Sequence, residues 1–397
     1  MPSKPLAGIK VIELGTLIAG PFATRLLAEF GAEVVKIESP DGGDPLRQWR
    51  VLHEGTSLWW YLQARNKKSV TVNLKHPAGK DIVRRLAREA DILVENFRPG
   101  VLEKLGLGWE SLSTANPRLV MVRLSGYGQT GPYKDRPGFG AVGEAMGGMR
   151  YVTGFPDRPP VKLGISIGDS IAALYGVIGA LMALRHRDRP GGRGQVVDVA
   201  LYEAVFSMME SLVPEFDAAG FIRERTGNVM PGITPSNTYA TRDGRNVIIG
   251  ANGDAIFRRF MLAIGRPELA EDPQLADNAG RSARADELYD AIGGWAAAQD
   301  LERVLEICDK AEVPATRIYS VADMFEDPQF MARDMIQSAL MPDGKSVRIP
   351  GIVPKLSETP GGTEWLGPAL GEHTEQVLAG IGFSQDQVAR LRRDGAI

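Results

Sequence analysis

The sequence contains few of the side chains that form disulfides or bind metals. Cys308 is its one cysteine, so no internal disulfide can form. The four histidines, at positions 53, 76, 186 and 373, are well separated along the chain. This spacing argues against a metal site built from histidine and cysteine. We therefore predict no bound metal and a reducing, cytoplasmic location.

The sequence also lacks long apolar runs and an excess of charge. Its longest apolar run, 171–184, is shorter than the ~20 residues that cross a bilayer. The first five residues, Met-Pro-Ser-Lys-Pro, contain no apolar signal core. The net charge of -3 gives no basic surface for nucleic acid. We therefore expect neither a membrane nor nucleic acid as a partner.

The first half of the chain alternates strand and helix patterns. Strands are predicted at 8–14, 33–38, 91–94, 118–124 and 194–201, and helices begin at Gly20, Pro77, Pro99 and Tyr202. This order is typical of an α/β fold with an open parallel sheet and helices on both faces. The glycine-rich stretch 126–160 is interpreted as a functional loop beyond a strand end.

The pattern changes after a predicted boundary between 214 and 226. Strands at 237–242 and 246–251 flank the hairpin pair Asp243-Gly244, and three helical segments follow. These features predict a smaller α+β domain. We place the domains at 1–215 and 226–330, with a C-terminal segment at 340–397.

The segment 162–171 (KLGISIGDSI) predicts a turn followed by a long helix that ends near 187. Asp169 falls at the start of this helix and has two interpretations. The commoner one is an N-cap. The other is a nucleophile, because an ionised carboxylate can attack an activated carbonyl without a general base. That chemistry suits a chain poor in histidine, and its product is a mixed anhydride.

Two other motifs compete with this interpretation. The G-x-G-x-x-G pattern at 126–131 is followed by Pro132 and Pro137 rather than by a helix, so a nicotinamide dinucleotide is not favoured. The G-x-S-x-G pattern at 164–168 would need a histidine to activate Ser166. His373 is the only candidate late enough in the chain, and it lies in an apparent surface segment.

Several motifs together resemble those of the family III CoA-transferases, the CaiB/BaiF type that includes formyl-CoA and carnitine CoA-transferases. The resemblance runs essentially from end to end. It is carried by 6–13, 19–21, 31–38, 66–69, 94–100, 125–128, 136–138, 168–169 and 192–195.

The resemblance implies a role for particular residues. Asp169 matches the acyl-carrying nucleophile. The residues that it implies in contact with CoA are Asn66, Lys67, Lys68, Asn96, Phe97, Arg98, Lys104 and Arg136. Basic side chains among them suit the phosphates of CoA. The alternative for these residues is a solvated basic face.

The resemblance also implies an architecture. The large domain would be Rossmann-like and bind CoA, and the C-terminal segment would return to it, so that the monomer forms an open ring. Two rings would interlock as a homodimer. CoA and acyl-CoA would be substrates rather than tightly bound cofactors.

The sequence departs from the family pattern in places that bear on the reaction. The related α-methylacyl-CoA racemases carry a catalytic histidine where this chain has Phe139, which favours CoA transfer over racemisation. The segment 227–232 lacks the run of glycines of formyl-CoA transferase, and Ile18 replaces a glutamine of that enzyme. Both differences disfavour formyl and oxalyl substrates.

The overall similarity favours succinyl-CoA as donor and a short dicarboxylic acid, such as glutarate, citramalate, itaconate or mesaconate, as acceptor. A distal carboxylate would need a cation, for which Arg47, Arg50 and Arg65 are candidates. A 2-methylacyl-CoA racemase and a non-catalytic acyl-CoA-binding protein remain as alternatives.

Overall fold

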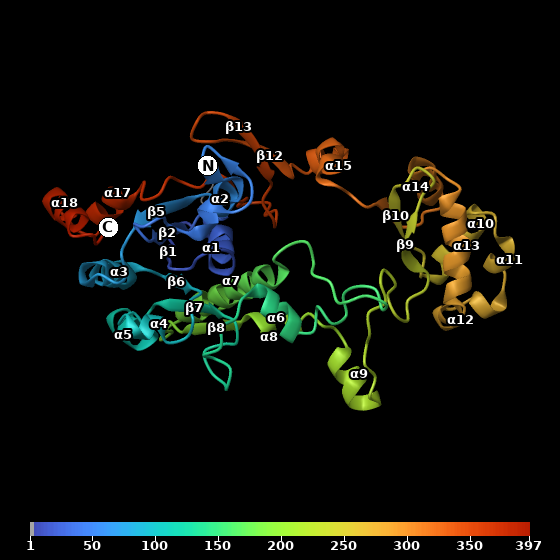
Figure 1. Ribbon diagram of the computed structural model, residues 1–397, viewed down its shortest axis with the longest axis horizontal. Coiled ribbons are helices and arrows are strands. Elements are labelled where there is room, and N and C mark those ends of the chain that lie inside the picture. The colour runs from blue at the N-terminus through green and yellow to red at the C-terminus, as the bar shows by residue number, and fades with distance from the viewer. Residues whose placement is uncertain (1–3) are drawn as a thin grey trace. The chain divides into compact units, whose positions relative to one another are not determined.

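The computed structural model describes residues 4–397, which form two compact units (Figure 1). The first unit contains residues 4–149, 162–220 and 332–397, and the second contains 150–161 and 221–331. The first three residues of the segment in which we expect no signal core lie outside the described residues.

The first unit is built on a parallel sheet of six strands in the order β5-β2-β1-β6-β7-β8. The strands are β1 (Lys10–Glu13), β2 (Glu33–Glu38), β5 (Lys67–Thr71), β6 (Ile92–Glu95), β7 (Val120–Ser125) and β8 (Val196–Ala200). The predicted parallel sheet is confirmed. Sequence patterning missed β5, because its first two residues are lysines and read as a polar segment.

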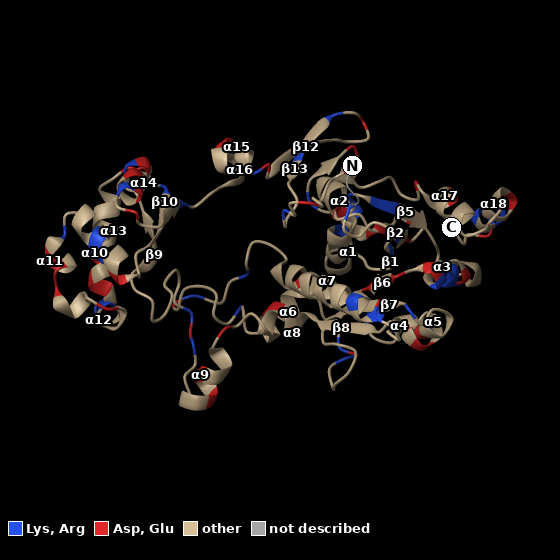
Figure 2. Cartoon of the chain, turned by 180° about the vertical axis from the view of Figure 1, so that it is seen from behind, with Lys and Arg blue, Asp and Glu red and all other residues tan. Residues whose placement is uncertain are grey.

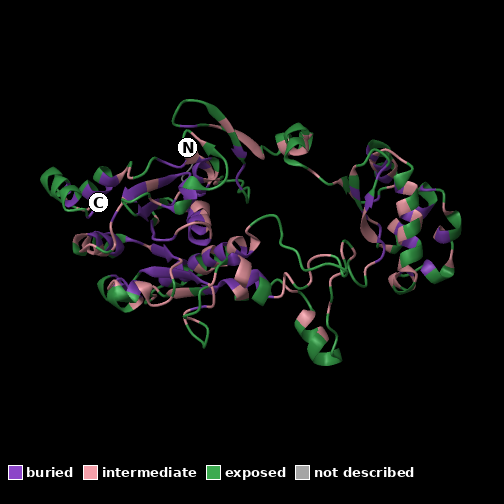
Figure 3. Ribbon diagram, in the orientation of Figure 1, coloured by how far each residue is buried: buried purple, intermediate pink, exposed green. Residues whose placement is uncertain are grey.

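Both faces of this sheet pack against apolar clusters, and Figure 3 shows most residues of its central strands as buried. Neighbouring residues of one strand enter different cores: Val11 belongs to one apolar cluster and Ile12 to the other. Strands buried on both faces are expected to be almost continuously apolar, which is why four of them were easy to recognise.

Helices cover each face. One face packs against residues of α3 (Pro77–Glu89), α4 (Val101–Lys104), α5 (Trp109–Ala115), α17 (Thr374–Gly380) and α18 (Gln385–Arg393). The other packs against α1 (Ala19–Glu29), α7 (Ile167–Arg187) and α8 (Leu201–Phe206). The helix predicted to begin at Tyr202 corresponds to α8, which ends at Phe206; Glu210 then has a positive φ of 51° and a separate helix, α9 (Leu212–Ala219), follows.

Helix α7 is longer than the apolar run that sequence analysis identified within it. At 21 residues it is long and apolar enough to cross a membrane by length and composition. In the structure its buried residues pack on the sheet and on α1. Its apolar character therefore has an explanation within the fold.

Part of the stretch predicted as a loop is helical. Helix α6 (Gly140–Met146) was missed because its glycines were read as turn signals. One of them serves close packing instead: a Cβ on Gly143 would lie 2.8 Å from the Cβ of Leu201 on α8.

Shorter elements complete the first unit. They are the 3-10 helix Pro45–Gln48, β3 (Leu52–His53), β4 (Thr56–Ser57), α2 (Leu58–Gln63), β12 (Ile336–Leu340) and β13 (Ser346–Pro350). Helix α16 (Pro328–Ala332) belongs to the second unit except for its last residue. The C-terminal segment covers the outer edge of β5, where the His373 N–H donates to the Ser69 carbonyl oxygen at 2.9 Å.

The second unit contains an antiparallel sheet in the order β11-β10-β9, and its predicted hairpin is confirmed. Its elements are β9 (Ser236–Ala240), β10 (Asn246–Gly250), α10 (Asp254–Ala263), α11 (Pro267–Ala270), the 3-10 helix Pro273–Leu275, α12 (Asn278–Ala283), α13 (Ala285–Ala297), α14 (Leu301–Lys310), β11 (Ala315–Arg317) and α15 (Val321–Glu326). The three predicted helices correspond to α10, α13 and α14.

Candidate active site

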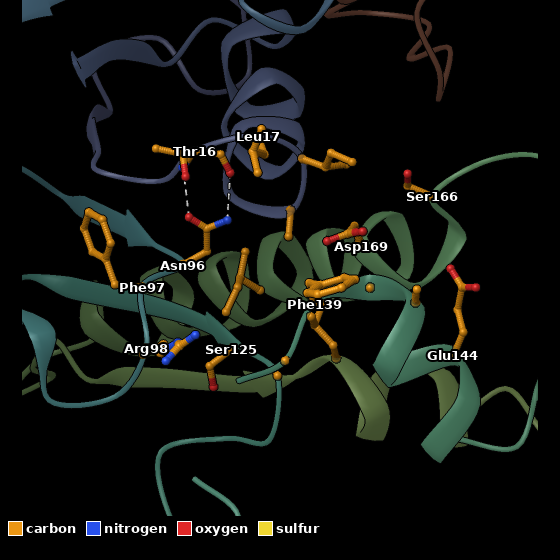
Figure 4. A pocket seen from close by; sticks show the side chains of 18 of the residues that line it. Thr16, Leu17, Asn96, Phe97, Arg98, Ser125, Phe139, Glu144, Ser166 and Asp169 are labelled. Atoms are coloured by element: carbon orange, nitrogen blue, oxygen red, sulfur yellow. Dashed lines mark hydrogen bonds between the residues drawn. The ribbon is translucent and has the colours of Figure 1, made fainter. Parts of the chain in front are cut away.

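The site lies where the strand order of the parallel sheet reverses. The chain moves outward from β1 to β2 on one side and continues from β6 on the other, so the loops after β1 and β6 diverge. Ligands bind in the crevice that forms at such a point. Here the Asn96 amide bridges the two loops: its Oδ1 accepts from the Thr16 N–H and its Nδ2 donates to the Thr16 carbonyl oxygen, both at 2.8 Å (Figure 4).

A buried charge cluster supports the loop after β1. The Glu13 carboxylate bonds Lys36 Nζ at 2.6 Å and Lys67 Nζ at 2.8 Å, and all three side chains are fully buried. Burial alone would raise the pKa of Glu13, but the two ammonium charges outweigh it and lower that pKa to about 2. Glu13 therefore stays ionised near neutral pH, and the cluster is an ion-pair network.

The same cluster shapes the wall of the site. Lys36 Nζ also bonds Asp44 Oδ2 at 2.8 Å, and the Asp44 carboxylate accepts the Leu17 N–H at 3.1 Å. Leu17 has a positive φ of 65°, which is uncommon for a residue with a Cβ. The Asp44 bond helps to hold that conformation, which directs the chain from β1 into the cavity wall.

The crevice contains a cavity of about 520 Å³. Its lining comes from the loops after β1, β6 and β7, from α6 and from the start of α7 (Figure 4). The polar and charged residues of the lining are Thr16, Asn96, Arg98, Ser125, Lys134, Arg136, Glu144, Lys162, Ser166 and Asp169.

Asp169 is the third residue of α7 and not its N-cap. The N-cap position is Ser166, whose side chain makes no capping hydrogen bond, so the capping interpretation is wrong. The Asp169 carboxylate lies directly over the start of α6, where a Cβ on Gly140 would be 2.0 Å from Oδ2. Glycine at position 140 thus makes room for the carboxylate within the cavity.

The environment of Asp169 raises its pKa to about 6, mainly through burial and further through the negative charge of Glu144. Its own backbone N–H and the Lys162 ammonium act in the opposite direction. The sequence argument assumed an unshifted carboxyl, so this increase is a correction. At pH 7 about nine-tenths of the carboxyl would still be ionised.

Groups for other chemistries are not assembled around Asp169. None of the described residues that line the cavity is a histidine, and Phe139 occupies the wall where a racemase would need one. Ser166 lines the cavity, but His373 Nδ1 accepts the Ser69 N–H at 3.3 Å, beside β5. The structure therefore assembles no Ser–His pair there.

Four of the eight residues implied in CoA binding line this cavity. They are Asn96, Phe97, Arg98 and Arg136. The Phe97 backbone is fixed because its N–H donates to Glu95 Oε2 at 2.7 Å. The Arg136 guanidinium stacks on Tyr133, with Cζ 3.6 Å from the ring centroid.

The other four lie outside the lining. Asn66 bonds the C-terminal segment, with Nδ2 2.6 Å from the Gly362 carbonyl oxygen. Lys67 and Lys68 lie on β5, which Figure 2 colours blue for basic residues. Lys67 belongs to the buried charge cluster, Lys68 pairs with Glu33 at 2.6 Å, and Lys104 is exposed on α4. Lys67 supports the loop after β1 instead of offering its charge to a ligand.

The three arginines considered for a distal carboxylate are also placed elsewhere. Arg47 forms a two-bond ion pair with Glu38, and Arg65 pairs with Glu29; both arginines are buried. Arg50 stacks on Trp59 with Cζ 4.3 Å from the ring centroid. None of the three lines the cavity that contains Asp169.

A second cavity of about 210 Å³ lies next to the first along the edge of the sheet. Thr16 and Phe97 line both, and Lys75 adds a basic side chain to the second. The two cavities therefore adjoin at Thr16 and Phe97, beside the switch point.

Sequence reasoning missed several residues of the first cavity. Two of them are Lys162 and Glu144. Lys162 is the first residue of the segment that contains Asp169, and Glu144 lies in the glycine-rich stretch. Glu144 is 2% exposed and its Oε1 accepts the Gly168 N–H at 3.4 Å. The sequence signal for Glu144 was a single acidic residue among glycines. Only the packing of α6 on α7 shows that this residue lies near Asp169.

One group of possible metal ligands lies away from this site. His53, Glu54 and Asp343 have ligand atoms within 4.8 Å of one another. His53 Nε2 already bonds Asp343 Oδ2 at 2.9 Å, and Lys345 Nζ lies 3.2 Å from the same oxygen. The lysine charge disfavours a cation there, so we assign no metal to this group.

Comparison with known proteins identifies matches along the whole chain. The profile of CoA-transferase family III matches residues 6–374. A succinyl-CoA–D-citramalate CoA-transferase of Chloroflexus aurantiacus is 50% identical over 98% of both chains. The beta subunit of a succinyl-CoA–L-malate CoA-transferase from the same organism is 45% identical and covers 98% of this chain and 97% of its own.

A solved structure shares the fold. The CaiB/BaiF family protein of Brucella suis has a TM-score of 0.84 and 35% sequence identity, and the match covers 96% of this chain and 100% of that one.

Proposed function

Because this chain belongs to CoA-transferase family III, we propose that it moves CoA from succinyl-CoA to a short dicarboxylic acid, with Asp169 carrying the acyl group. The observation that carries this proposal is the Asp169 carboxylate, set at the start of α7 in a cavity whose described lining contains no histidine. The relatives named for citramalate and malate support a hydroxylated dicarboxylic acid as acceptor.

The first half of the reaction transfers the acyl group to the enzyme. An Asp169 carboxylate oxygen attacks the thioester carbonyl of the donor, and the C–S bond breaks to give an aspartyl–acyl anhydride and CoA thiolate. The thiolate then attacks the aspartyl carbonyl carbon. The anhydride C–O bond breaks, which releases the donor acid as its carboxylate and leaves an Asp169–CoA thioester.

The second half repeats these steps with the acceptor. Its carboxylate attacks the Asp169 thioester, which forms a new anhydride and frees the thiolate. The thiolate attacks the acceptor's carbonyl carbon in that anhydride and regenerates the Asp169 carboxylate. No net proton transfer is needed, which agrees with a cavity whose described lining has no histidine.

The position at the start of α7 suits each step. Backbone N–H groups in the first turn of a helix lack intrahelical partners and lie at the positive end of the helix dipole. They can stabilise the oxyanion that forms when the Asp169 carbonyl or the donor carbonyl becomes tetrahedral. Exclusion of water matters as well, because water would hydrolyse the anhydride and the enzyme-bound thioester.

CoA would lie along the two adjoining cavities. Its thioester end would reach Asp169, and the chain would pass Phe97 and Thr16, which line both cavities. Arg98, Lys134 and Arg136 in the cavity lining supply positive charge for the phosphates. We retain Asn96, Phe97, Arg98 and Arg136 as CoA contacts, whereas the side chains of Asn66, Lys67, Lys68 and Lys104 lie outside both cavities.

We also propose a homodimer of interlocked ring-shaped monomers, as the family resemblance implies, and a cytoplasmic location, as the single cysteine suggests. An apolar stripe on α7 supports association: Leu174, Ile178, Leu181 and Met182 are between 40% and 67% exposed. Their spacing places them on one face of the helix. A second copy of the chain would cover this stripe.

Chemical trapping tests the proposed nucleophile. The protein is incubated with succinyl-CoA, treated with hydroxylamine or borohydride, and digested for mass spectrometry. We expect modification at Asp169 in the parent and none in Asp169→Asn. A modification confined to another side chain removes Asp169 from the mechanism, and acyl-CoA binding without modification or turnover indicates a non-catalytic binding protein instead.

A further inference from the structure

The cavity has two chemically different ends. Figure 4 shows Arg98 beside Ser125, whereas Asp169, Ser166 and Glu144 lie toward the other end. Lys134 and Arg136 belong to the loop that leaves the sheet at Ser125. The acyl group must lie at the Asp169 end, because that is where the anhydride forms.

The Asp169 end is unfavourable for a second carboxylate unless a cation is present. Asp169 is ionised, and Glu144 is a buried acidic residue whose negative charge acts on Asp169. The free carboxylate of a dicarboxylic acyl group would be repelled by both. A donor or acceptor of this class therefore requires a positive charge near the nucleophile.

Lys162 supplies a positive charge at this end. It lines the cavity and its positive charge acts on Asp169. In the part of the chain that the structure describes, Lys162 forms no ion pair, whereas Lys134 bonds Asp135 at 3.0 Å and Arg136 stacks on Tyr133. The Lys162 ammonium group is therefore available to a ligand.

The charge balance of the reaction gives Lys162 a specific use. When Asp169 becomes acylated, its negative charge disappears and the neighbouring ammonium loses that interaction. A dicarboxylic acyl group restores a negative charge through its free end, whereas a monocarboxylic acyl group does not. The enzyme-bound CoA thioester carries no dicarboxylic acyl group, so this compensation applies to the two anhydrides, one formed with the donor acyl group and one with the acceptor.

We propose that Lys162 binds the free carboxylate of the dicarboxylic acyl group and thereby selects dicarboxylic over monocarboxylic substrates. This inference rests on the proposed function, since it assumes acylation of Asp169. It replaces the three arginines that sequence reasoning considered, because two of those are buried in ion pairs and none lines the cavity.

Isotope exchange between an acyl-CoA and its own free acid tests the inference. Succinyl-CoA with labelled succinate is compared with butyryl-CoA and labelled butyrate, which differ in carrying a carboxylate or a methyl group at the same place. For Lys162→Met we expect kcat/KM for succinyl exchange to fall about tenfold or more, the scale of a lost hydrogen bond to a charged group. Butyryl exchange should stay constant or rise, and Lys162→Arg should retain the preference for succinyl-CoA.

Lys134→Met is the matched control, because it removes the same charge from the lining of the same cavity at a residue that is not among those whose charge acts on Asp169. It should weaken exchange of both acyl-CoAs alike. An unchanged succinyl-to-butyryl ratio in Lys162→Met, with Asp169 still trapped by hydroxylamine, overturns the role of Lys162 and leaves the proposed function intact. Absence of any exchange or trapping in the parent protein overturns the proposed function itself.

Discussion

At the scale of single residues, the shifted pKa of Asp169 links the structure to a pH dependence. The nucleophile must be unprotonated, and its folded-state pKa is raised to about 6, chiefly by burial. We expect kcat/KM to be constant above neutral pH, to fall to about half at pH 6 and to about one-tenth at pH 5. Initial rates over this range, with thermal melts to confirm folding at each pH, measure the effect. A profile that stays flat down to pH 5 would contradict it.

The contact between Gly140 and Asp169 allows a second residue-scale prediction. A Cβ at position 140 would lie 2.0 Å from Asp169 Oδ2, so Gly140→Ala must displace the carboxylate. We expect kcat to fall on the order of a hundredfold, the usual effect of misplacing a reacting group by about an ångström. Acyl-CoA binding, measured by calorimetry, should change little.

Gly164→Ala provides the control for that variant. A Cβ there would meet nothing within 4 Å, and the residue lies just before α7. It adds the same methyl group without touching the carboxylate. Equal losses of kcat in the two variants would show that Gly140 does not act through Asp169.

At the scale of elements, the buried charge cluster joins β1, β2 and β5 beneath the cavity. Glu13→Gln would leave Lys36 and Lys67 buried without their shared carboxylate. Breaking a buried ion pair in this way costs about 3–5 kcal/mol. Urea unfolding of the variant should show that loss.

The pH dependence of this contribution has a definite sign. The folded-state pKa of Glu13 is lowered to about 2, so its contribution is complete above the unfolded pKa near 4 and disappears as pH falls through 2. Glu89→Gln is the control, because Glu89 pairs with Lys10 on the surface. Its effect should be within about 1 kcal/mol. A similar loss in both variants would show that burial is not what makes the cluster important.

Sequence patterning succeeded where one periodicity dominates an element and failed where two requirements overlap. The apolar strands β1, β2, β6 and β7 were recognisable because both of their faces are buried. In β5, Lys67 belongs to the buried charge cluster. In α6, Gly143 allows close packing on α8, and Gly140 makes room for the Asp169 carboxylate. From sequence alone the lysines indicate a polar segment and the glycines indicate a turn, because their contact partners are distant in the sequence.

The same limit applies to the site. Asp169 was identified from its position at a predicted helix start, supported by the family resemblance. Lys162 and Glu144 could not be assigned to it, because their roles depend on how the loop before α7 and α6 approach one carboxylate. Lys67 was placed in the wrong environment, since a basic residue in a matching motif does not reveal that its charge is already neutralised.

At the scale of the whole molecule, the exposed stripe on α7 predicts self-association. Ile178→Glu would place a charge in the centre of this stripe, so we expect it to convert the proposed dimer to monomer or to prevent its assembly. Sedimentation velocity at micromolar protein concentration measures the change. Glu110→Lys, at an exposed position of α5 on the opposite face of the sheet, should leave the association unchanged. A parent protein that sediments as a monomer would contradict the proposed dimer.

The outer edge of β5 becomes paired only by residues far along the chain. The Ser69 carbonyl oxygen accepts from the His373 N–H, and the Thr71 N–H donates to Thr374 Oγ1, a separation of 303 positions. While the ribosome is still adding those residues, the nascent chain carries an open strand edge, which is a template for pairing with other chains. Protection of that edge by a chaperone during synthesis would therefore matter more for the yield of this protein than for its final stability.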